Sequence, residues 1–173
     1  MTGRIDAEFA TGFIERLLHA VNTHDAQAVA ELCAEDVVWE DPAAPETLRG
    51  REAVLLFHRD VMFRAIPDVR IELADGPHLA VDGRSLAMLL RIRGTMTGPL
   101  VPPGFAPTGG PVEFETAEFS RFSGGLLASH KVVLNMLDLA RQIRAVPGPG
   151  SFGDKIGVWL QRVVARKAGH GQG

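Results

Sequence analysis

The sequence predicts an α+β fold in which a curved antiparallel sheet is covered on one face by three helices. Apolar residues recur at helical spacing in most of the first 65 residues, whereas residues 69–137 alternate with a period of two. Helices and strands that occupy separate parts of a chain are typical of this class. A curved sheet under helices forms a cone, and we expect the cone to enclose a mostly apolar pocket.

The helices are predicted from apolar spacing and from signals at their ends. Phe9, Phe13 and Leu17 recur every four residues and give the first helix one wide apolar face. Asp25 can cap a second, short helix, and Pro67 follows the end of the third. The elements expected in this part of the chain are helices over about 6–22, 25–33 and 51–65, and a strand over 36–41.

The strands follow in the middle of the chain. In residues 69–74 and 86–93, apolar side chains occupy every second position. Turn signals occur at 75–77 and 82–83. The Pro- and Gly-rich loop 98–110 is long enough to form the rim of a pocket. The remaining expected elements are strands over 112–122 and 126–137, and a short helix that ends near 146.

A Pro-Gly-Pro-Gly run at 147–150 divides the chain. Residues 1–146 form the predicted domain, and residues 147–173 form a linker and an additional amphipathic, basic helix. We expect the apolar face of this helix to pack on the body of the protein or on a partner subunit. That face carries Phe152, Ile156 and Leu160.

The composition excludes several classes of protein. With 46% hydrophobic and 23% charged residues, the chain resembles soluble globular proteins with a sizeable core. Its net charge of −3 offers no basic excess for nucleic acid, although residues 139–173 alone, with six Lys or Arg and one Asp, carry +5. No apolar stretch is long enough for a membrane span, and the first residues lack the apolar segment of a signal peptide. We therefore expect a cytoplasmic protein.

No metal or nucleotide site is predicted. Cys33 is the single cysteine, so an internal disulfide and a cysteine-rich zinc site are excluded. His58, His130 and Asp41 match no spacing of metal ligands. The sequence also lacks a phosphate-binding glycine loop and a nucleophile elbow. We expect chemistry without a cofactor.

Asp41 is the first candidate catalytic residue. Strand alternation places it on the same face as Val37 and Trp39, whose side chains are of types that point inward. An inward carboxylate at the end of a strand can act as a general base. The alternative is a structural role, in which Asp41 caps the turn beside Pro42.

Glu118 is the second candidate. The even-numbered positions of its strand, which include Phe114 and Phe122, are more apolar than the odd ones, so Glu118 is expected to point into the pocket. A carboxylic acid that stays neutral there can donate a hydrogen bond to a developing enolate oxygen. The alternative is a buried structural residue paired with a neighbour.

His130 is linked to Glu118 by the predicted hairpin. A three-residue loop over 123–125 pairs Phe122 with Leu126 and places His130 directly opposite Glu118. Such a pair in a cavity can handle protons. It can equally be two buried polar groups that satisfy each other.

Short motifs follow one another through the chain in a specific order: Val21–Asp25, Cys33–Pro42, Gly50–Ala53, Ile66–Val69, Gly94–Gly98, Arg121–Phe122, Ser129–His130 and Arg141–Ile143. Together they resemble the nuclear transport factor 2-like superfamily. Within it, the chain is most similar to SnoaL-like polyketide cyclases and ketosteroid isomerases. The resemblance covers about residues 8–146 and implies the cone-shaped fold of that superfamily.

The resemblance also implies roles for individual residues. Asp41 matches the general-base Asp of the ketosteroid isomerases, and Glu118 lies close to the position of their protonated oxyanion-hole Asp. Leu17 stands where those enzymes carry a Tyr. His130 matches a strand His of the SnoaL-like cyclases, and Asn135 stands at their acid/base Asp, where it would position an oxygen.

The expected function is that of an enzyme acting on a hydrophobic polyketide-like or polycyclic ketone. Proton abstraction next to the carbonyl would lead to aldol-type ring closure or isomerisation. His58, on the apolar stripe of the third helix, either lines the pocket or is a satisfied core histidine. The residues expected to contact the substrate are Leu17, Trp39, His58, Met62, Met88, Leu90 and Phe105.

Two other functions stay open. One is a non-catalytic module that binds a hydrophobic ligand or takes part in assembly. The other is an epoxide hydrolase, against which the absence of tyrosine counts. In each case we expect a homodimer, because Leu89, Phe119 and Val133 give the outer face of the sheet an apolar patch.

Overall fold

The predicted α+β class is confirmed. The computed structural model describes residues 4–44, 46–100 and 104–169, without the side chains of 166–169. The helices are α1 (Ala7–Asn22), α2 (Ala26–Glu31), α3 (Arg51–Phe57), the π-helix η1 (His58–Met62), α4 (Phe63–Ala65), α5 (Met136–Gln142) and α6 (Phe152–Gly169). The strands are β1 (Cys33–Glu40), β2 (Leu48–Arg49), β3 (Arg70–Leu79), β4 (Ser85–Thr95), β5 (Pro111–Ser123) and β6 (Leu126–Leu134).

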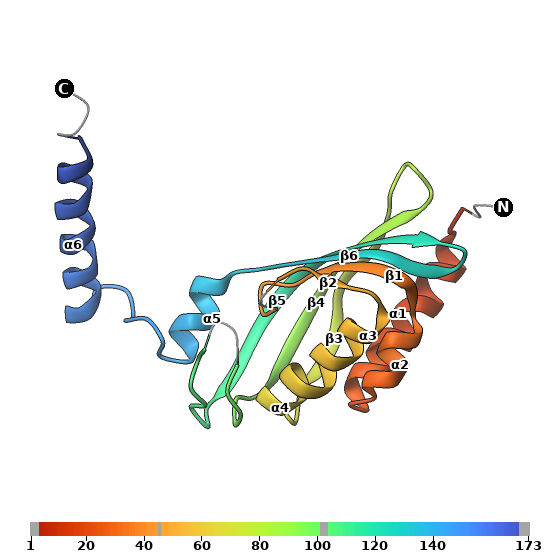
Figure 1. The fold of residues 1–173 in the computed structure, drawn as a ribbon, viewed down its shortest axis with the longest axis horizontal. Coiled ribbons are helices and arrows are strands. Elements are labelled where there is room, and N and C mark those ends of the chain that lie inside the picture. The colour runs from red at the N-terminus through yellow and green to blue at the C-terminus, as the bar shows by residue number, and fades with distance from the viewer. Residues whose placement is uncertain (1–3, 45, 101–103, 170–173) are drawn as a thin grey trace.

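The six strands form one curved sheet in the order β2-β1-β6-β5-β4-β3, with α1 to α4 over its inner face (Figure 1). The sheet was expected to be antiparallel throughout, but β1 runs parallel to β6. No hairpin joins these two strands, because most of the chain lies between them, so their direction is not constrained by a turn.

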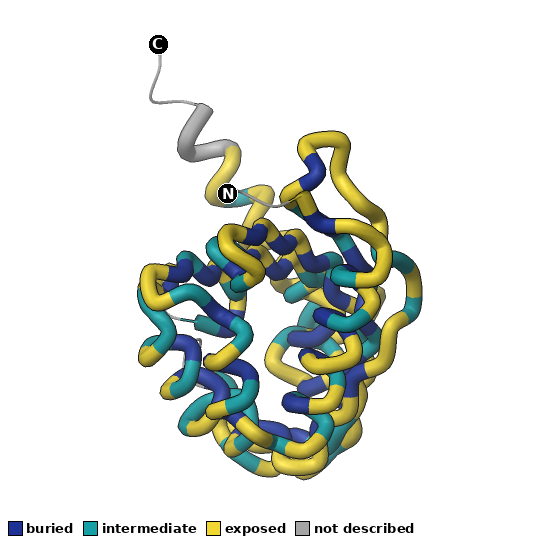
Figure 2. Tube along the Cα trace, turned by 90° about the vertical axis from the view of Figure 1, so that its right-hand side faces the viewer, coloured by how far each residue is buried: buried dark blue, intermediate teal, exposed yellow. Residues whose placement is uncertain are grey.

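Burial alternates along the strands as the period of two predicts, and Figure 2 shows buried and exposed positions following one another along the chain. On β5 the even positions Thr116, Glu118 and Ser120 are buried. Phe13 of α1 packs edge-on against Phe122 of β5, with ring centroids 4.8 Å apart. This contact joins the first helix to the end of β5, and neither ring lines the cavity described below.

The third helix is interrupted. The predicted helix over 51–65 is present, but it changes to a π-helix at His58–Met62 before α4 completes it. Single π-helical turns of this kind are frequent at functional sites. His58 is the first residue of this interruption.

The turn that the sequence predicts at 75–77 is absent. Strand β3 continues through these residues to Leu79, and two register shifts against β4 absorb them. Bulges of this kind increase the local twist of a strand. Glycine and proline there therefore bend the strand without ending it.

The β5–β6 turn is shorter than predicted. Ser123 pairs with Leu126, so the loop contains only two residues, Gly124 and Gly125. Both have positive φ, 60° and 81°. That is the backbone of a type I′ hairpin turn, which glycine adopts without steric cost.

A bulge on β6 then restores the inward faces. Ala128 has no partner on β5, because the register shifts between Arg121 and Phe122. His130 therefore lies opposite Ser120, and not opposite Glu118 as predicted. A two-residue turn alone would have placed His130 on the outer face, and the one-residue bulge returns it to the inside.

The C-terminal helix does not pack on the body of the protein, which was one of the two surfaces expected for it. Helix α6 follows α5 after a linker and extends away from the sheet (Figure 1). Phe152, Ile156 and Leu160 are 80%, 42% and 50% exposed, so packing of this face on the body is wrong, and packing on a partner subunit stays a prediction. In the part of the chain that the structure describes, no helix has the length and apolar character needed to cross a bilayer.

Candidate active site

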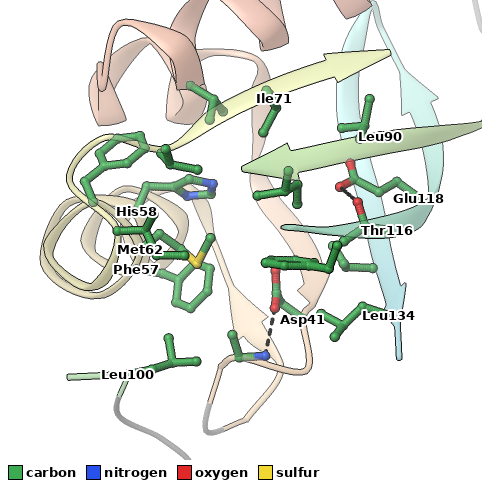
Figure 3. Close-up of a pocket in the computed structure, with 18 of the residues that line it drawn as sticks. Asp41, Phe57, His58, Met62, Ile71, Leu90, Leu100, Thr116, Glu118 and Leu134 are labelled. Atoms are coloured by element: carbon green, nitrogen blue, oxygen red, sulfur yellow. Dashed lines mark hydrogen bonds between the residues drawn. The ribbon is translucent and has the colours of Figure 1, made fainter. Parts of the chain in front are cut away.

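A cavity lies between the helices and the inner face of the sheet (Figure 3). Its polar residues are Asp41, His58, Thr116 and Glu118. The rest of the lining is apolar and includes Leu17, Val21, Trp39, Phe57, Met62, Leu90, Leu100 and Leu134. A few polar groups that converge in an apolar cavity are typical of a small-molecule site.

Asp41 lies where the chain leaves β1, and its side chain lines the cavity. Its Oδ1 accepts a hydrogen bond of 2.8 Å from the backbone N–H of Ala43. The turn-capping role and the inward position therefore occur together. Burial raises the pKa of the Asp41 carboxyl above its ordinary value, the Ala43 N–H opposes this shift, and the charge of Glu118 adds to it. A raised pKa makes the carboxylate a stronger base.

Glu118 is buried on β5 within a chain of polar side chains. Its Oε1 accepts a hydrogen bond of 2.9 Å from the Thr116 hydroxyl. Its Oε2 lies 3.2 Å from Nε2 of His130. The Nδ1 of His130 is 3.0 Å from the Ser120 hydroxyl. The predicted Glu118–His130 contact therefore exists, but it is diagonal across the strands.

His130 itself lies behind the wall of the cavity. It is 2% exposed, and its ring lies 4.0 Å from the indole of Trp39 by centroid distance. Trp39 lines the cavity, so it separates His130 from the space that a ligand would occupy. From this position His130 can act on a ligand through Glu118.

His58 lines the cavity from the helical side, whereas Glu118 belongs to the sheet (Figure 3). Its Nδ1 lies 2.8 Å from the carbonyl oxygen of Val54, one helical turn earlier. Burial lowers the pKa of His58 to about 4. The sequence left open whether His58 is a core histidine, and the structure shows a residue that is both buried and part of the cavity wall.

Four of the other expected contact residues, Leu17, Trp39, Met62 and Leu90, also line the cavity. Met88 points inward but is buried in the packed core, opposite Glu118 in the sheet. Phe105 is half-buried and pairs through its backbone with Leu100, and Leu100 is the residue that reaches the cavity. Met88 and Phe105 are therefore not lining residues.

Asn135 does not belong to the site. It is exposed and caps α5, where its side chain accepts a hydrogen bond of 3.2 Å from the N–H of Asp138. The strand ends at Leu134, one residue before it. Asn135 is exposed and is not among the residues that line the cavity, so the predicted role of Asn135 in positioning an oxygen is wrong.

Two polar residues were missed. Thr116 and Ser120 lie two positions on either side of Glu118 and bond to Glu118 and His130. Because side chains two residues apart share one face of a strand, the alternation that identified Glu118 could have identified both. Within the described part of the chain, no three His, Cys, Asp or Glu side chains lie close enough together to hold a metal ion.

The model of the SnoaL-like domain family matches residues 14–130. The chain belongs to this family. The matched region contains Leu17, Asp41, Glu118 and His130. A comparison with curated proteins found no match.

Solved structures of the same fold come from several proteins. TsrD from Streptomyces laurentii is 22% identical, with a TM-score of 0.67 over 80% of this chain and 97% of its own. AclR from Streptomyces galilaeus is 20% identical, with a TM-score of 0.65 over 96% of this chain and 99% of its own. SalBIII, an epoxide hydrolase/cyclase-like enzyme in pyran ring formation in the polyether salinomycin, is 22% identical, with a TM-score of 0.63 over 77% and 95%. At these identities the likeness concerns the fold.

Proposed function

We propose that this SnoaL-like protein is a cofactor-independent enzyme that moves a proton next to the carbonyl of a hydrophobic ketone. The observation that carries the proposal is the pair of carboxyl groups, Asp41 and Glu118, in one apolar cavity. They have different surroundings, since Asp41 is held by a backbone N–H and Glu118 by Thr116 and His130. Two carboxyls in different surroundings can divide the roles of base and acid.

In this mechanism Asp41 takes a proton from the carbon next to the carbonyl. The electron pair of the broken C–H bond moves toward the carbonyl oxygen, which a proton shared by the Glu118–His130 pair would stabilise. His130 and Thr116 hold Glu118 in position. The enolate then either takes the proton back from Asp41 at another carbon, which is isomerisation, or attacks a second carbonyl of the substrate. The second route closes a ring and leaves an alkoxide, which takes the proton from Asp41.

The first test follows the exchange of α-hydrogens in a model ketone, 2-tetralone, in D₂O by NMR. We expect the protein to speed exchange above buffer, and Asp41→Asn to lower the rate by about 10²–10⁴-fold, the usual contribution of a general base. Asp36→Asn, an exposed carboxylate on the same strand, is the matched control and should exchange as the native protein does. The rate should fall as pH falls through the raised pKa of Asp41, because only the ionised form accepts a proton.

Two outcomes would contradict this proposal. Exchange no faster than in buffer would leave a protein that binds a hydrophobic ligand without catalysis. Hydrolysis of styrene oxide without ketone exchange would instead favour epoxide opening, the chemistry named for SalBIII.

A further inference from the structure

The ring of His58 is held in one tautomer by its surroundings. Its Nδ1 lies 2.8 Å from the Val54 carbonyl oxygen, and a carbonyl only accepts hydrogen bonds. Nδ1 must therefore carry a proton. The pKa of about 4 keeps the ring neutral near pH 7, so Nε2 carries no proton and is an acceptor.

The imidazole ring of His58 is surrounded by aromatic side chains. The rings of Trp39, Phe57 and Phe63 stand around the imidazole with centroids 5.3, 5.4 and 5.9 Å away. Among the described residues, the one hydrogen bond of the His58 ring is made by Nδ1. Figure 3 shows the ring directed into the cavity. A ligand in the cavity is thus the partner available to Nε2.

We propose that Nε2 of His58 accepts a hydrogen bond from a hydroxyl or enol group of the ligand. The cavity then selects hydrophobic molecules that carry such a donor over their ethers and deoxy analogues. An analogue without the donor leaves a buried acceptor unpaired, which is the usual source of strong discrimination by a polar group. The inference rests on the proposed use of this cavity, but it concerns binding and needs no turnover.

The two carboxyl groups of the cavity are already partly engaged. Glu118 already receives the Thr116 hydroxyl on Oε1, and its Oε2 faces His130. Asp41 receives the Ala43 N–H on Oδ1, which leaves Oδ2 as the competing acceptor. A test must therefore separate His58 from Asp41.

The test compares three fluorescent probes of the same ring system: 2-naphthol, 2-methoxynaphthalene and naphthalene. We expect the native protein to bind 2-naphthol about 3–10-fold more tightly than the other two, the range given by one net hydrogen bond. His58→Phe keeps an aromatic ring but has no acceptor, so the preference for 2-naphthol should be lost, with the affinity for naphthalene unchanged. Asp41→Asn should keep the preference.

Several results would overturn the proposal. One is that the preference for 2-naphthol is lost in Asp41→Asn and kept in His58→Phe. Another is that the native protein binds the three probes equally, or binds none of them. His58→Gln, which keeps an acceptor oxygen, serves if His58→Phe does not fold and should keep part of the preference. Histidine ¹⁵N NMR of the native protein at pH 7 tests the tautomer directly, and a proton on Nε2 of His58 would also overturn it. Loss of ketone exchange with the preference intact would count against the proposed function alone.

Discussion

His58 is buried and neutral, and this links the stability of the fold to pH. The unfolded chain has an ordinary histidine pKa near 6.5, whereas the folded protein holds it at about 4. Between these two values the unfolded chain binds a proton that the folded protein does not. The free energy of unfolding therefore falls as pH falls through this window, and the contribution is fully lost below the folded pKa.

The expected loss is about 3 kcal/mol between pH 7 and pH 4, from a difference of roughly 2.5 pKa units. Urea denaturation at the two pH values measures it. In His58→Leu the fall should be smaller by about that amount, whereas His19→Gln, an exposed histidine of α1, should behave as the native protein does. An equal fall in His58→Leu would contradict a neutral His58.

At the residue scale, sequence reasoning succeeded where burial alternates. Val37 and Trp39 predicted the inward side chain of Asp41, and this is confirmed. Asn135 was assigned by resemblance alone, and it failed because the strand ends one residue before it. Alternation is a local physical constraint, whereas the end of a strand depends on which residue caps the next helix.

Among the elements, α6 is the one whose environment the sequence did not predict. Its spacing predicts an amphipathic helix, and the helix is present, but Phe152, Ile156 and Leu160 of its apolar face are 42–80% exposed. Periodicity shows which face of a helix is apolar but not which surface covers it. The division of the chain at 147–150 stays a prediction.

Truncation after Val146 is expected to change the unfolding temperature by less than about 4 °C. The exposed side chains of α6 bury little apolar surface, so their loss should cost about 1 kcal/mol or less, which corresponds to roughly 2–4 °C at this chain length. Circular dichroism at two protein concentrations measures it. A larger fall at high concentration alone would indicate that α6 packs on another copy. A larger fall at both would mean that α6 packs on its own body in solution.

At the scale of the whole molecule, the outer face of the sheet carries exposed apolar side chains. Phe119 and Val133 are 51% and 47% exposed there, with Leu89 half-buried beside them. Exposed apolar patches of this kind often bind a partner. The homodimer inferred from these residues stays a prediction.

Sedimentation at micromolar concentration should give twice the chain mass of 18.6 kDa. Phe119→Glu should give a monomer, because it places a charge in the apolar patch. Val81→Glu is the matched control, since Val81 is 98% exposed in the β3–β4 turn, away from the patch. A native protein that sediments as a monomer would contradict the dimer.

The predicted cone of helices over a curved sheet is confirmed, because it follows from hydrophobic period and from the separation of helices and strands along the chain. The parallel pairing of β1 with β6 was missed, since strand direction between distant segments leaves no mark in a local pattern. The register of β5 against β6 was missed because the turn and the bulge each shift it by one residue.

The unpaired Ala128 has a consequence for comparing this chain with its relatives. The turn and the bulge each add or remove a single residue, so two relatives can have hairpins of equal length with the extra residue in different places. In a sequence alignment, a gap placed in the turn instead of at Ala128 would shift the positions between the turn and Ala128 by one. Residues that face the inside of the sheet would then be aligned with residues on its surface. Where identity is near 20%, as it is with AclR, the assignment of a catalytic residue to β6 therefore depends on locating one alanine whose side chain is outside the site.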